Sequence, residues 1–191
     1  MTLLAIGVLL FAGVHLSKSL APSFRPDMQK RLGENGYKGI FSLLILGSIA
    51  LIVFGWRSTV PQYLYNTPAA MQAPALFLLV VAFWLLVVSA RPSRVHRLLR
   101  HPQLTGVGLW GVAHLLLNGD SRSLVLFGGM AIWALLEMFA INRRDGAWTK
   151  AQAPTLGADV INLVITAVVV AVVVYVHPWL SGMPVIGPLQ Q

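Results

Sequence analysis

Apolar residues run along this chain in long blocks that contain no Lys, Arg, Asp or Glu. These blocks cover residues 1–17, 39–56, 58–90, 101–119, 123–136 and 160–191. A helix of about 20 mostly apolar residues crosses the hydrocarbon core of a bilayer, where only helices and closed barrels satisfy the backbone. The blocks are continuously apolar rather than alternating, which argues against a barrel. We therefore predict helices over 2–18, 39–57, 72–90, 103–118, 122–141 and 158–177.

The predicted fold is all-α: a polytopic membrane protein with a bundle of about six transmembrane helices, forming a single domain over residues 1–191. The fourth helix is the shortest. Proline and glycine indicate the connections. Residues 21–37 are expected to form the longest loop, Asn118-Gly119-Asp120 a turn, and Pro178 the end of the last helix.

Composition excludes an ordinary soluble domain. Apolar residues make up 57% of the chain and charged residues 10%, with a mean hydropathy of +0.74, whereas soluble domains carry about a quarter charged residues. There is no cysteine, so the chain has no disulfide and no thiolate ligand. The net charge of +8 would suggest nucleic acid as a partner of a soluble protein. Here the positions of the charges indicate a membrane instead, and no nucleic acid is expected.

The basic residues predict the orientation. Of the 14 Lys and Arg residues, 12 lie within 18–38, 91–100 and 143–150, and the other two are Arg57 and Arg122. Lys and Arg accumulate on the cytoplasmic side of membrane proteins. We therefore expect the three basic segments in the cytoplasm and both termini outside it.

Ionisable residues within apolar helices are candidates for function. His15, His114 and Glu137 are the principal ones, with Asn162 as a weaker candidate. At ~1.5 Å per residue, His15 and Glu137 lie roughly 20 Å below the outer face, and His114 lies roughly 16 Å above the inner face. All three estimates fall in the cytoplasmic half of the bilayer. Two histidines at a similar depth on different helices could ligate one haem iron from opposite faces.

The surroundings of His114 are compatible with that interpretation. Trp110 and Asn118 share its helix face at i−4 and i+4, Gly111 removes bulk from the same helix, and Arg100 could pair with a haem propionate. Structural alternatives stay open for each residue. His114 could bond a neighbouring helix, His15 could reach towards the headgroups, and Glu137 could bond across helices or carry a proton.

A series of motifs then resembles one family. These motifs are Gly13-Val14-His15, Arg31-Leu32-Gly33-Glu34-x-Gly36-Tyr37, Arg100-His101-Pro102-Gln103-x-x-Gly106, Trp110-x-x-Ala113-His114-x-x-x-Asn118-Gly119-Asp120, Glu137, and Asn142-Arg143-Arg144-Asp145. In this combination the sequence resembles the NnrU family of bacterial inner-membrane proteins. That family is associated with denitrification and is similar to the 15-cis-zeta-carotene isomerase.

The resemblance implies a haem b with His15 and His114 as axial ligands, in a protein of nitrogen-oxide redox metabolism or sensing. It also implies a haem-dependent isomerase of a hydrophobic polyene as an alternative. The isomerase's additional cysteine corresponds to Gly111 here, so a thiolate ligand cannot operate. The Arg-His-Pro motif also resembles membrane methyltransferases that use S-adenosylmethionine, which is a third interpretation, although their downstream Glu-Glu pair is missing. The expected partners are the lipid bilayer, haem, and nitric oxide or a polyene.

Overall fold

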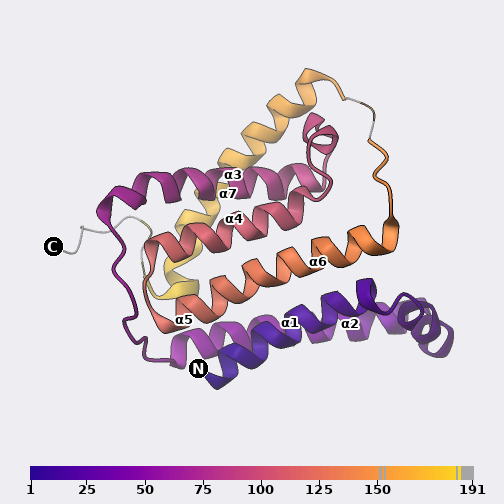
Figure 1. Ribbon diagram of the computed structural model, residues 1–191, viewed down its shortest axis with the longest axis horizontal. Coiled ribbons are helices and arrows are strands. Elements are labelled where there is room, and N and C mark those ends of the chain that lie inside the picture. Colours follow the sequence, from indigo (N-terminus) through magenta and orange to yellow (C-terminus); the bar gives the residue numbers. More distant parts are fainter. Residues whose placement is uncertain (151, 153, 184, 186–191) are drawn as a thin grey trace.

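A computed structural model of the protein describes residues 1–150, 152, 154–183 and 185. Within this range the fold is all-α, as predicted, and no strand is present (Figure 1). The longer helices are α1 (Thr2–Leu20), α2 (Phe24–Ser58), α3 (Gln72–Ser89), α4 (Pro102–Leu117), α6 (Gly129–Asp145) and α7 (Leu156–Ser181). The short elements are η1 (Ala69–Met71), η2 (Arg94–Arg97), α5 (Ser121–Ser123) and η3 (Leu124–Gly128), of which η3 is a π-helix continuous with α6.

The helices are those of a membrane protein. Among the described residues, five are long and apolar enough to cross a bilayer: α1, α2, α3 with η1, α6 with α5 and η3, and α7. The sixth, α4, has 16 residues and lies against α3 and α6 (Figure 1). Large apolar side chains such as Leu9, Phe54 and Phe139 are exposed. Exposed apolar surface on every side is what a lipid solvent requires.

Two connections differ from the prediction. Residues 21–37 are not a loop, because α2 begins at Phe24 and runs through a kink at Gly33, where φ is +74°. Pro26 lies in the first turn of the helix, where its missing N–H is not needed. Phe24, Met28 and Leu32 are spaced by four residues, so they share one apolar face. A short amphipathic helix therefore precedes the membrane-spanning part of α2.

The last helix also continues past the expected end. Pro178 lies inside α7, which ends at Gly182 in the left-handed conformation, with φ +78°. Glycine adopts this conformation without the steric cost of a side chain and is common just after a helix. The signal that ends α7 is therefore the glycine and not the proline.

Glycines allow the helices to approach closely. A Cβ at Gly55 would overlap the backbone of Leu4 in α1, and one at Gly7 would lie 2.8 Å from the backbone N of Ile52 in α2. A Cβ at Gly106 in α4 would lie 2.8 Å from the carbonyl O of Ala82 in α3. Lipid provides no hydrophobic drive between helices, so such backbone contact supplies much of their association.

The predicted turn is present and anchors a loop. Asp120 accepts hydrogen bonds from the N–H groups of Arg122 and Ser123, which caps α5. The carbonyl O of Gly119 accepts hydrogen bonds from the N–H groups of Leu64 and Tyr65. The loop between α2 and η1 is thereby attached to the turn at the end of α4.

We predict that Gly55→Ala destabilises the bundle by about 1–3 kcal/mol, because the added methyl group overpacks the α1–α2 contact. Thermal unfolding in detergent measures the change. Gly47→Ala, on the same helix, is the matched control, since a Cβ there meets nothing within 4 Å. Equal unfolding midpoints for the two variants would contradict the role given to Gly55.

Candidate functional site

His114 lies in an aromatic cluster at the end of α4. Its ring centroid is 4.8 Å from that of Trp110 and 4.2 Å from that of Phe127, on which it stacks at 20°. Its Nδ1–H donates a hydrogen bond of 2.9 Å to the carbonyl O of Trp110. Because a carbonyl only accepts, this bond places the proton on Nδ1 and leaves a lone pair on Nε2.

His15 has the same arrangement in α1. Its Nδ1–H donates to the carbonyl O of Phe11, again at 2.9 Å. Its ring lies 4.3 Å from Phe11, 5.1 Å from Trp133 and 5.7 Å from Phe41, measured between centroids. The Nζ atom of Lys18 lies over the Phe41 ring, 3.3 Å from its centroid. Each histidine thus has its Nε2 lone pair in a largely apolar, aromatic environment.

The two imidazoles do not share one depth, which differs from the prediction. His15 packs on Trp133 and His114 on Phe127, and these two residues are separated by six positions along η3 and α6, or about 9 Å. Trp110 contacts His114 and also packs against the core cluster that contains Trp133. The offset arises because α1 and α4 contact the same stretch of η3 and α6, where Val8 meets Gly129 and Gly111 meets Phe127 and Ala131. His15 lies about two turns beyond Val8, towards Trp133, whereas His114 lies one turn beyond Gly111, towards Phe127.

Glu137 is buried between α6 and α1, with 7% of its surface exposed. Its Oε1 accepts a hydrogen bond of 2.5 Å from the Ser19 hydroxyl. Its Oε2 has no hydrogen-bond partner, nor has the Nε1–H of Trp133 one turn away. Of the roles considered for Glu137, the structure shows a hydrogen bond between two helices, from Ser19 in α1 to Glu137 in α6. The unpaired oxygen and the unpaired indole N–H lie on the part of α6 that packs against α1 near His15.

Asn162 has a structural role. It is 1% exposed. Its Oδ1 accepts from Arg91 Nε at 2.8 Å, and its Nδ2 donates to the carbonyl O of Pro92 at 3.0 Å. Asp159, one turn earlier, accepts from the Ser93 hydroxyl. These bonds attach α7 to the segment that follows α3, away from both histidines.

Other predicted residues hold α4 in place. A Cβ at Gly111 would lie 2.6 Å from the carbonyl O of Phe127, so this glycine allows α4 to approach η3 closely. The Asn118 Nδ2 donates to the carbonyl O of His114 at 2.9 Å. Arg100 donates to the carbonyl O of Gly146 at 2.6 Å. Each of these bonds fixes a helix end.

Sequence reasoning missed residues that contact His15 and residues that bind the end of α4. Tyr65 donates its hydroxyl to the carbonyl O atoms of Leu115 and Asn118, at 2.7 and 3.0 Å. Burial, with a smaller effect of Asp120, raises the pKa of Tyr65, which keeps the hydroxyl a donor. Phe11 and Trp133 are at i−4 from His15 and Glu137, a spacing that could have indicated them.

The donor set restricts which metal group could bind. Among the described residues, no three His, Cys, Asp or Glu side chains are grouped as a metal ion would require. A haem needs only one or two axial ligands from the protein. The Nε2 lone pair of either histidine alone would meet that requirement. The offset in depth means that they do not, as arranged here, face each other across one iron.

This fold and these residues define a polytopic helical membrane protein with two partly buried imidazoles in aromatic clusters. The model of the NnrU protein family matches residues 3–185. The chain therefore belongs to the NnrU family, as its motifs indicated. Searches of the curated proteins and of the solved structures return no match.

We predict that Ser19→Ala lowers stability by about 1–3 kcal/mol, because it leaves both carboxyl oxygens of Glu137 without a donor. Adding Glu137→Leu to that variant should restore most of the loss, since the unpaired carboxyl group is removed. Thermal unfolding in detergent measures each midpoint. Ser17→Ala is the control, because its hydroxyl bonds only the carbonyl O of Val14 in its own helix. Strictly additive effects of the two substitutions would contradict this account.

Proposed function

We propose that this NnrU-family protein is a b-type haem protein of the bacterial inner membrane, with a role in nitrogen-oxide redox metabolism or sensing. One observation supports it most. Both His15 and His114 anchor Nδ1–H on a carbonyl of their own helix and leave Nε2 free. This is the arrangement by which metal-ligating histidines are oriented and made more basic.

His15 and His114 are the proposed axial ligands. Bound haem would supply a one-electron couple and, where one axial position is open, a site for nitric oxide. The aromatic rings around each imidazole exclude water and restrict its rotation. Trp110 packs on His114, Trp133 packs on His15, and the two indoles belong to one packed cluster. Holding one haem with both histidines would therefore require these rings to move, whereas holding it with one histidine would not.

The basic residues support a role at the cytoplasmic edge. Arg100 and its neighbours in the segment after α3 lie at the opposite end of α4 from His114, so they would pair through forked hydrogen bonds with the propionates of a haem held by His15. We further propose that this segment, together with residues 18–38 and 143–150, faces the cytoplasm and that both termini are periplasmic. The concentration of Lys and Arg in these three segments supports that orientation.

We predict a red protein with a sharp low-spin α band after reduction by dithionite if both histidines ligate the iron. His15→Ala and His114→Ala should each weaken that band and lower the haem content at least ~10-fold. Absorption spectra of protein purified with added haem measure both effects. Binding of carbon monoxide by the reduced wild type would indicate one open axial position.

His96→Ala is the matched control for this experiment. Its Nε2, rather than Nδ1, is occupied by bonds to the carbonyl O atoms of Val88 and Arg91, so it has no free Nε2 to offer. Its spectrum should equal that of the wild type. A colourless wild type, or equal spectra for all three histidine variants, would exclude the proposed haem ligation.

We predict the orientation from a labelling experiment that the cysteine-free chain allows. Tyr63→Cys and Leu98→Cys each introduce a single thiol at positions that are 73% and 80% exposed. A membrane-impermeant maleimide should label the Tyr63→Cys variant in intact spheroplasts and the Leu98→Cys variant only after lysis. The reverse pattern would refute periplasmic termini.

A further inference from the structure

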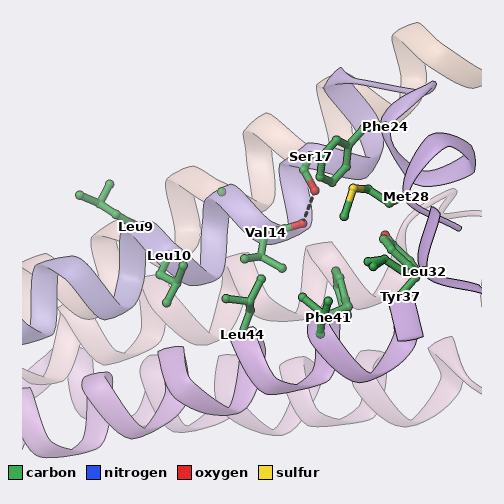
Figure 2. A pocket seen from close by; sticks show the side chains of 12 residues that line it. Leu9, Leu10, Val14, Ser17, Phe24, Met28, Leu32, Tyr37, Phe41 and Leu44 are labelled. Carbon is green, nitrogen blue, oxygen red and sulfur yellow. Dashed lines mark hydrogen bonds between the residues drawn. The ribbon is translucent and has the colours of Figure 1, made fainter. Parts of the chain in front are cut away.

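A cleft between α1 and the first half of α2 is not used by the proposed haem site. It has a volume of about 310 Å³ and lies where the short helix of residues 24–32, which precedes the Gly33 kink, meets the end of α1 (Figures 1 and 2). Its walls include Gly13 and Ser17 of α1 and Met28, Tyr37 and Phe41 of α2. Binding sites for small molecules begin at about this size.

Tyr37 is the feature of this cleft that packing does not explain. The residue is only 8% exposed, and its hydroxyl has no hydrogen-bond partner. Figure 2 shows the hydroxyl end turned towards Met28, on the side of the cleft where Ser17 lies. Ser17 uses its own hydroxyl on the carbonyl O of Val14. A buried phenol without a partner costs free energy, and a ligand with an acceptor oxygen would remove that cost.

The lining selects the chemistry of such a ligand. None of the twelve described residues that form the cleft is charged, which disfavours a carboxylate or a phosphate. A pure hydrocarbon would leave the Tyr37 hydroxyl unpaired. The rings of Phe24, Tyr37 and Phe41 and the thioether of Met28 offer flat, polarisable surfaces. These features fit a neutral, lipid-soluble ring that carries a carbonyl group.

We propose that the α1–α2 cleft binds a lipid-soluble quinone, with a ring carbonyl accepting a hydrogen bond from the Tyr37 hydroxyl. Met28 covers the hydroxyl in the structure, and its unbranched side chain moves aside at little cost. Gly13 gives the ring room, because a Cβ there would meet nothing within 4 Å. The site does not depend on haem, although Phe41 connects the cleft to His15.

Binding of decylubiquinone to the full chain in phosphatidylcholine nanodiscs tests this proposal, with binding to empty nanodiscs subtracted. Gly13→Leu should abolish binding, because the longer side chain fills the cleft without meeting other atoms at its Cβ. Tyr37→Phe should weaken binding roughly 3- to 10-fold, the effect of one hydrogen bond. Gly47→Leu is the matched control on α2, where a Cβ also meets nothing within 4 Å, and should bind like the wild type.

Decylbenzene, which lacks the carbonyl groups, should bind the wild type and the Tyr37→Phe variant equally. Gel filtration establishes that each variant is folded, and Tyr37→Phe, which removes only one oxygen, keeps the test decisive if Gly13→Leu is unstable. Quinone binding equal to that of empty nanodiscs, or unchanged by Tyr37→Phe, would overturn the proposal. Displacement of the quinone by palmitate at lower concentration would also overturn it, in favour of a carboxylate site. The haem content of these samples reports separately on the proposed function.

Discussion

Lipid cannot hydrogen-bond to the protein, and this constraint determines most of the structure. Every backbone N–H and C=O in the bilayer must be paired within the chain, so the chain forms helices. The same constraint acts on polar side chains. His15, Ser17, Ser48 and His114 each donate to a carbonyl three or four residues earlier in their own helix. For the histidines, this hydrogen bond also determines the tautomer, so the proton lies on Nδ1 and the lone pair lies on Nε2.

Buried polar atoms without a hydrogen-bond partner are exceptions to this constraint. A buried polar atom without a partner is costly, and native structures contain few. In the α1–α2–α6 part of the bundle, three such atoms are the Trp133 Nε1–H, the Glu137 Oε2 and the Tyr37 hydroxyl. The first two lie one helix turn apart on α6, with Trp133 in contact with His15, whereas the third lies in the α1–α2 cleft. They indicate two separate places among the described residues where a buried polar atom lacks a hydrogen-bond partner.

The sequence predicted the helices well because their signal is local. Absence of charge over about 20 residues located the spans, and Asn118-Gly119-Asp120 located the turn. The sequence-based prediction was wrong where contacts between distant segments determine the structure. Pro22, Pro26 and Gly33 indicated a loop, but Pro26 falls in a helical first turn and Gly33 only kinks α2. The bond from Ser19 to Glu137 joins residues 118 positions apart, and no spacing rule reaches that far. The depth of each histidine in the bundle depends on how α1 and α4 pack against α6. The pattern of apolar and polar residues does not specify that packing.

The π-helix η3 lies at the level of His114, and the regular helix α6 that follows it lies at the level of His15. A π-turn inserts an extra residue into a helix, which rotates the faces before and after it, and such turns are frequent at functional sites. Here Phe127 lies within η3 and turns towards α4 and His114. Gly129 and Trp133, beyond it, turn towards Val8 and His15 in α1. The two imidazoles therefore lie against one continuous helix at two levels, His114 on the π-helical turn and His15 on the regular helix beyond it.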